Sequence, residues 1–155
     1  MQIQQKAIIN SSKEKDKNKN KDNNNNNNNP LFDRNVDLIT AGLSAGYARA
    51  LRNEISQDNA LIICDCILSM NTEINLSYNY RKSNIDRLVK FSKFHNHKPF
   101  RQISREEALA FLDNLRKPES LDPMHKWIGT YNTYRIQLIR FFKWLYYPVI
   151  ELIIT

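Results

Sequence analysis

The sequence predicts an all-α protein, a compact four-helix bundle that follows a disordered Asn/Lys-rich N-terminal segment. The chain of 155 residues contains only 3 Gly and 5 Pro, whereas an all-β fold needs many turn residues. Apolar residues recur at helical spacing in the C-terminal two thirds of the chain, with no convincing strand pattern and no internal repeat. Four short helices joined by connections of modest length favour a bundle.

The N-terminal part sets the expected domain boundaries. Lys alternates with acidic residues from residue 13, and seven consecutive Asn fill positions 23–29. Such a segment buries too little apolar surface to offset its ordering entropy, so residues 1–30 are expected to be disordered. Residues 31–55 are mixed: Ala45–Ile55 could form one short helix, but Gly42 and Gly46 disfavour it. The ordered domain is therefore expected at 56–148, with 149–155 as a truncated linker or tail.

The first three expected helices follow in order. Ser56 or Gln57 opens the first, which runs to about Met70 over an apolar stretch. Ser77 caps the second, which reaches about Phe94 and has one apolar face: Tyr78, Ile85, Leu88 and Val89. The third opens on a capping box between Ser104 and Glu107, and its apolar face comprises Ala108, Leu109, Phe111, Leu112 and Leu115.

The fourth expected helix runs from Thr130 to Pro148, which ends it. One face of a helical wheel is apolar: Tyr131, Tyr134, Leu138, Phe141, Phe142 and Leu145. The opposite face holds Asn132, Thr133, Arg140 and Lys143. The second helix repeats this arrangement with Asn79, Lys82, Lys90 and Lys93, interrupted by Asp86.

The charge of the chain indicates its class of partner. The net charge is +7, and residues 71–147 carry fourteen Lys/Arg against seven Asp/Glu. A basic excess on a folded, aromatic-rich segment favours a polyanion such as nucleic acid, although the same Lys could simply solvate the surface. We expect no signal peptide and no membrane span, because the N-terminus is polar and no run of about 18 apolar residues exists.

Catalytic and metal chemistry are not expected. The two cysteines, Cys64 and Cys66, lack zinc-ligand spacing and are interpreted as small buried hydrophobes, which suits a reducing cytoplasm. His95 and His97 are expected to end the second helix, where positive charge suits the helix dipole. No acid/base pair or activated nucleophile appears, so we expect no enzyme, no cofactor, no metal and no small-molecule substrate.

Three segments in order carry a family resemblance. They are Asn75-Leu-Ser-Tyr-Asn-Tyr-Arg81 leading to Leu88-Val-Lys-Phe91, then Ile103-Ser-Arg-Glu-Glu-Ala-Leu-Ala-Phe-Leu112, then the helix from Thr130 ending Arg140-Phe-Phe-Lys-Trp-Leu145. Together they resemble the N-terminal, SAM-like core-binding domain of tyrosine site-specific recombinases, the phage-integrase family, in its archaeal form. The resemblance covers roughly Ser56 to Pro148.

That resemblance implies a domain that clamps one face of double-stranded DNA during integration or recombination. In the family a separate downstream domain cuts DNA with a nucleophilic Tyr, two Arg and a His or Lys. Only seven residues follow Pro148, so this catalytic domain is not expected here. The implied partners are duplex DNA and full-length recombinase protomers, in the cytoplasm at the nucleoid.

The candidate DNA contacts lie mainly on the polar faces and first turns of the second and fourth helices. They are Asn79, Arg81, Lys82, Lys90, Lys93, Lys126, Asn132, Thr133, Arg135, Arg140 and Lys143. A solvated helix surface is the alternative for the charged ones, and Arg135 lies near the core boundary. For the whole chain, a helical protein-interaction module and a non-functional remnant of a mobile element remain alternatives.

Overall fold

The structure, a computed structural model, describes residues 29–73 and 77–147. Within these residues the chain is helical and has no strand, so the all-α class is confirmed. The elements are α1 (Pro30–Thr40), α2 (Ala45–Arg49), the π-helical turn η1 (Ala50–Glu54), α3 (Gln57–Glu73), α4 (Tyr78–Phe94), the 3-10 turn η2 (Phe100–Gln102), α5 (Arg105–Asn114) and α6 (Trp127–Tyr146).

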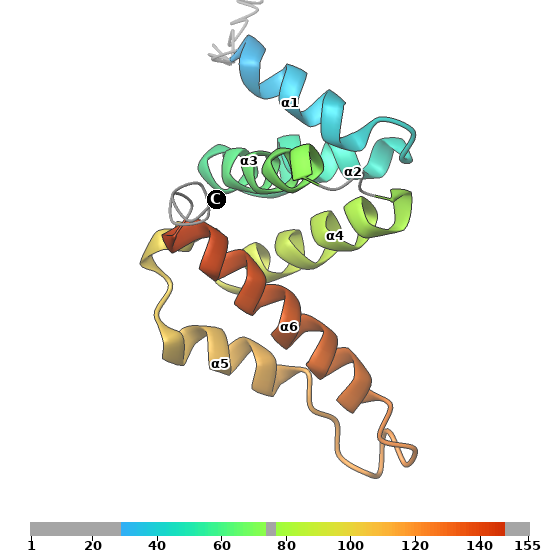
Figure 1. The fold of residues 1–155 in the computed structure, drawn as a ribbon. Coiled ribbons are helices and arrows are strands. Elements are labelled where there is room, and N and C mark those ends of the chain that lie inside the picture. The colour runs from blue at the N-terminus through green and yellow to red at the C-terminus, as the bar shows by residue number, and fades with distance from the viewer. Residues whose placement is uncertain (1–28, 74–76, 148–155) are drawn as a thin grey trace, which may run out of the picture.

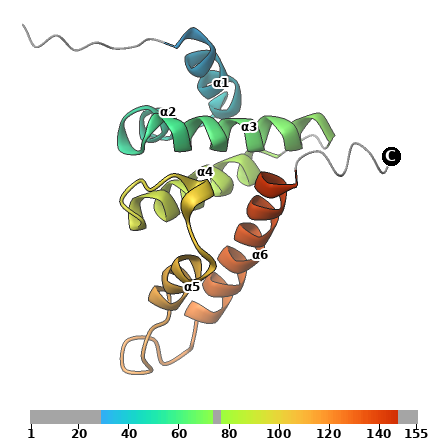
Figure 2. The same cartoon turned by 90° about the vertical axis from the view of Figure 1, so that its left-hand side faces the viewer.

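The helices are arranged on both sides of α4. Figures 1 and 2 show α1 and α3 at one end of the molecule and α5 and α6 at the other, with α4 between them. Helix α3 packs against α1 and α4 and also contacts α6. α6 and α5 run side by side and are joined by the long loop 115–126.

Folded structure begins well before Ser56, where the sequence places the start of the domain. The side chain of Asn29 accepts hydrogen bonds from the amides of Leu31 (3.2 Å) and Phe32 (3.3 Å), so Asn29 caps a helix that opens on Pro30. Helix α1 then buries Phe32, Val36 and Ile39 in the core. The expectation of disorder for residues 1–28 lies outside the described residues.

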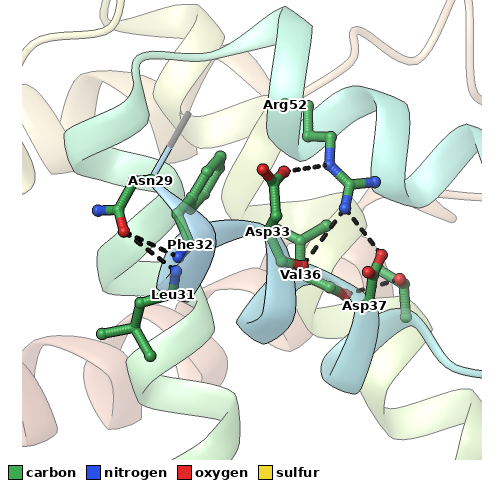
Figure 3. A network of polar contacts seen from close by, with 8 residues as sticks. Asn29, Leu31, Phe32, Asp33, Val36, Asp37 and Arg52 are labelled. Carbon is green, nitrogen blue, oxygen red and sulfur yellow. Dashed lines mark hydrogen bonds and ion pairs between the residues drawn. The ribbon is translucent and has the colours of Figure 1, made fainter. Parts of the chain in front are cut away.

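Arg52 holds α1 against the rest of the fold (Figure 3). Its Nε donates to Asp33 Oδ1 at 3.0 Å, and its Nη2 donates to Asp37 Oδ1 at 2.7 Å and to the Asp33 carbonyl at 3.3 Å. The hydrogen bond to Asp37, followed by the other contacts with the two carboxylates, raises the pKa of Arg52 above its already high value. Residues 31–55 are thus two helices and a π-helical turn that pack on the domain.

The local capping signals are confirmed. Ser77 accepts a hydrogen bond from the Tyr80 amide at 3.2 Å, and α4 ends at Phe94. Ser104 and Glu107 form the expected capping box, with the reciprocal hydrogen bonds at 3.2 Å and 2.8 Å. Helix α6 begins before the predicted Thr130 because an Asp122 carboxylate oxygen accepts the Trp127 amide at 2.8 Å. The predicted stop at Pro148 lies outside the described residues.

The core is built around phenylalanines. Phe91 contacts Phe111 edge-to-face at 5.1 Å between ring centroids, and Phe100 contacts Phe141 in the same way at 5.1 Å. On α6, Tyr134, Leu138, Phe141 and Leu145 are buried, as predicted. Two residues assigned to apolar faces are exposed instead, because no element in the described part of the chain covers them: Tyr78 at 47% and Leu109 at 39%.

The cysteines and Asn59 lie in the same interior. Cys64 and Cys66 are buried free thiols, which confirms their interpretation as small buried hydrophobes. Burial raises the pKa of each thiol to about 12. Asn59, fully buried, donates to Ser92 Oγ and to the Lys98 carbonyl, both at 3.0 Å, and accepts from the Phe100 amide at 3.1 Å. It thereby ties α3 to the turn that follows α4.

Candidate nucleic-acid interface

Helices α4 and α6 carry most of the predicted contact residues. Each helix turns its apolar face inward, and Ile85 and Leu88 of α4 are buried together with Leu138 and Phe141 of α6. Their polar faces are therefore left at the surface. A groove of about 380 Å³ lies between the two helices, with α4 side chains on one wall and α6 side chains on the other.

This groove brings together three of the predicted residues. Asn79 lines it from the first turn of α4, and Thr133 and Arg140 line it from α6. All three side chains are exposed. The hydroxyl of Thr133 donates to the Gly129 carbonyl at 2.8 Å within its own helix, so Asn79 and Arg140 supply the donors that face solvent.

A hydrogen-bonded network crosses the groove. Arg87 Nη1 donates to Gln137 Oε1 at 2.9 Å, and Gln137 Nε2 donates to Asn84 Oδ1 at 2.7 Å. Asn84 in turn donates to the Tyr80 carbonyl at 2.8 Å. The network fixes α4 and α6 relative to each other at this point and orients a half-buried arginine in the groove.

Arg87 is held in a position suited to an anion. Its guanidinium carbon lies 5.7 Å from the centroid of the Tyr134 ring, so the ring supports one face of the cation. Gln137 occupies one of its five N–H donors. Within the described residues neither Arg87 nor Arg140 has a carboxylate partner, so both charges are available to an external anion.

Lys90 and Lys93 lie on the other side of α4, where they line a small depression beside α2 and η1. Lys90 forms an ion pair with Asp86 at 3.0 Å, and Lys93 forms one with Glu54. The hydrogen bond to Asp86 raises the pKa of Lys90, which stays protonated near neutral pH. Exposed ion pairs of this kind are worth at most about 1 kcal/mol, so a phosphate can compete for both lysines.

Arg81 has a structural contact that the sequence does not reveal. Its Nη1 donates to the Ile39 carbonyl at 3.0 Å and to the Ala41 carbonyl at 2.9 Å, at the C-terminal end of α1. A cation in this position satisfies carbonyls that a helix end leaves without partners. Arg81 therefore binds α1 to α4 and lies apart from the groove.

The remaining predicted residues are dispersed. Arg135 lies on the other side of α6, in a groove that α6 forms with α5. Lys126 is the last residue of the loop that joins α5 to α6, directly before Trp127. Lys82, Asn132 and Lys143 are exposed on the outer faces of their helices. The structure thus gathers part of the predicted set in one groove and leaves the rest around its edges or elsewhere.

Arg87 and Gln137 are among the groove residues that the sequence did not predict. Arg87 lies eight residues after Asn79, and Gln137 lies four residues after Thr133. These spacings place each on the same side of its helix as the predicted residue. The spacing of Arg87 and Gln137 was therefore visible in the sequence, but a helical wheel does not reveal which side of α4 faces α6.

His95 is packed as an aromatic side chain. It contacts Phe91 and Phe94 edge-to-face, at centroid distances of 4.7 Å and 5.0 Å. Burial lowers the pKa of His95, which favours the neutral ring over the cation that the helix end was expected to favour. Among the described residues no group of three His, Cys, Asp or Glu side chains could hold a metal ion.

Comparison with protein-family models, with curated proteins and with solved structures finds no match for this chain. In the part of the chain that the structure describes, no helix is both long and apolar enough to cross a membrane.

Proposed function

We propose that this chain binds double-stranded DNA through the groove between α4 and α6, and that α3 to α6 are a SAM-like core-binding domain of the tyrosine recombinase type. The observation that carries the proposal is the convergence of Asn79, Arg87 and Arg140 in one groove, with no carboxylate partner for either arginine among the described residues. The net charge of +7 supports a polyanionic partner.

The chemistry of the groove suits a phosphate backbone. Two guanidinium groups offer charge-assisted hydrogen bonds in a planar geometry, and the Asn79 amide adds neutral donors beside them. Lys90 and Lys93 lie on the other side of α4 from this groove, so they add to the positive charge of the domain without contacting the phosphates that the groove would hold. Contacts of this type position a protein on duplex DNA and carry little sequence information, so weak sequence preference is expected.

The proposal includes no catalytic step. In the recombinase context the chain supplies DNA binding alone, and strand cleavage belongs to full-length protomers that share the DNA. We expect no covalent adduct between this protein and a suicide DNA substrate that traps a cleaved strand.

The test is the salt dependence of duplex binding. Arg87→Ala and Arg140→Ala should each weaken binding and each lower the slope of log K against log salt by about 0.9, because one phosphate contact is lost. Arg135→Ala is the matched control, since it removes an exposed arginine from the far side of α6. Circular dichroism confirms that each variant folds.

The outcomes separate the alternatives. If Arg135→Ala changes the affinity for DNA and the salt slope as much as Arg87→Ala and Arg140→Ala do, the groove is not the interface. Absence of duplex binding by the unaltered protein even at low salt would refute the DNA-binding function and favour a protein-interaction module.

A further inference from the structure

A second groove lies between α5 and α6 and is apolar. It has a volume of about 460 Å³, and its floor includes the buried side chains of Leu112 and Leu138. Its walls expose large apolar side chains: Leu109 at 39%, Ile139 at 44% and Tyr146 at 48%. Apolar surface gathered in one concave place is typical of a binding site.

The charged side chains that line this groove are both arginines. Arg105 contributes from the start of α5 and Arg135 from α6, and both side chains are exposed. Among the described residues neither arginine has an ion-pair partner. The groove therefore combines apolar walls with positive charge, and it fits an occupant that is apolar and acidic.

The two arginines lie apart along the groove. The start of α5 adjoins the end of α6, because Arg101 donates to the Leu145 carbonyl at 3.2 Å and the Tyr146 hydroxyl donates to the Arg101 carbonyl at 3.3 Å. Arg105 is therefore near the C-terminal end of α6, whereas Arg135 lies in the N-terminal half of that helix. A ligand with one acidic group, such as a fatty acid, reaches one arginine and not the other.

The walls of the groove select the kind of backbone that fits. Both walls are helices, whose backbone N–H and C=O groups are paired within each helix, so they offer no sheet edge to an extended peptide. An extended segment would leave backbone groups unpaired against apolar side chains, which is costly. A helix pairs its own backbone groups and presents side chains alone. The same groove of a second copy does not fit, since it is also concave and carries the same charge.

We propose that the α5–α6 groove is the docking site for an amphipathic helix of another protein, with one apolar face and acidic residues along its edge. The length suits such a helix, because α6 rises about 22 Å, at 1.5 Å per residue, between Tyr131 and Tyr146 at the two ends of the groove. A helix of about four turns covers that length and places apolar side chains at i, i+4, i+7 and i+11 on the walls. Acidic side chains roughly two turns apart then face Arg105 and Arg135.

This groove is separate from the proposed DNA interface. Thr133 and Arg140 line the α4–α6 groove, whereas Arg135 and Ile139 line the α5–α6 groove on the opposite side of α6. The inference therefore does not rest on DNA binding, and both grooves can be occupied in one molecule.

The test measures binding of a synthetic helical peptide to the full chain by fluorescence anisotropy. The peptide carries leucines at the four apolar positions and glutamates beside them, two turns apart. Arg135→Glu should weaken binding about fivefold, the upper end of what one exposed ion pair contributes, and a peptide with lysines in place of the glutamates should bind this variant better than it binds the unaltered protein. Arg140→Glu is the matched control, because it changes the net charge equally on the opposite side of α6, and it should leave binding nearly unchanged.

A second pair of variants tests the apolar wall. Leu109→Asp should weaken binding about tenfold, because it places a charge against the apolar face of the peptide. Leu121→Asp, at a residue that is 76% exposed in the loop after α5, should have no effect. Circular dichroism confirms that each variant folds, as expected for changes at exposed side chains.

Four results would overturn the proposal. The first is no binding at millimolar peptide, and the second is equal weakening by Arg135→Glu and Arg140→Glu, which would mean that net charge alone attracts the peptide. The third is displacement of the peptide by dodecanoate, which would identify a lipid site. The fourth is tighter binding by the Ile150→Asp, Leu152→Asp variant, which would mean that the C-terminal residues of the chain compete for the groove.

Discussion

Replacing Asn59 by leucine tests the interior of the fold. Leucine has the same number of side-chain heavy atoms and a similar branched shape, so the change removes the amide without opening a cavity. The Phe100 amide and the Lys98 carbonyl would lose the partners that they have at 3.1 Å and 3.0 Å, and Ser92 Oγ would lose a donor at 3.0 Å. Asn59, Ser92 and Phe100 are each 0% exposed, so water cannot replace the lost hydrogen bonds without a change in packing.

The magnitude follows from the groups left without partners. The Phe100 amide is buried, and a buried donor that loses its hydrogen bond costs about 1–3 kcal/mol in the free energy of unfolding. The Lys98 carbonyl is part-buried and adds at most the same again, so the expected loss is about 1–6 kcal/mol. That is a large share of the 5–15 kcal/mol, roughly, that stabilises a typical domain. Asn59→Asp should also destabilise, because it keeps an acceptor for Phe100 but places a carboxylate oxygen against the Lys98 carbonyl.

Urea unfolding followed by circular dichroism measures the loss, provided that the m-value is unchanged. Asn132→Leu, on the exposed face of α6, is the control and should change the free energy of unfolding by less than about 0.5 kcal/mol. A loss of that small size for Asn59→Leu would refute the role assigned to this buried amide.

Three further predictions concern stability. Phe141→Ala should lower the free energy of unfolding by about 3–5 kcal/mol in urea titrations, because Phe141 is 1% exposed and the change leaves a cavity; a loss near zero would contradict its burial. Arg52→Met should speed hydrogen exchange of the α1 amides relative to those of α6, since Arg52 holds Asp33 and Asp37; unchanged exchange would argue against this tether. The pKa of the Glu107 carboxyl is lowered from 4.5 to about 2, mainly by the hydrogen bond that it accepts from Lys98. The stabilisation by this charge is therefore present above pH 4.5 and is lost as the pH falls toward 2. Glu107→Gln should be less stable than the unaltered protein at pH 7, and the difference between their urea midpoints should narrow as the pH falls from 4.5 toward 2. If the difference between the two urea midpoints does not depend on pH, the charge of Glu107 is not its cause.

The candidate site was only partly predictable. The helical spacing of apolar and polar residues identified the polar sides of α4 and α6, and Asn79, Thr133 and Arg140 do lie in one groove. This spacing did not show that Arg81 donates to a carbonyl at the C-terminal end of α1, or that Lys93 pairs with Glu54. A helical wheel fixes directions around one axis, whereas these contacts depend on how two separate elements are placed.

The sequence by itself determined what depends on neighbouring residues. Ser77 and the Ser104–Glu107 pair set helix starts because their hydrogen bonds span three residues, and the apolar period of α6 fixed which side of it is buried. The tertiary structure alone decided the rest. Arg52 reaches back to α1, and Gln137 joins α4 to α6 across 53 positions. Such pairs form only when packing of the whole core brings remote segments together. A local pattern of residues does not specify which remote segments will meet.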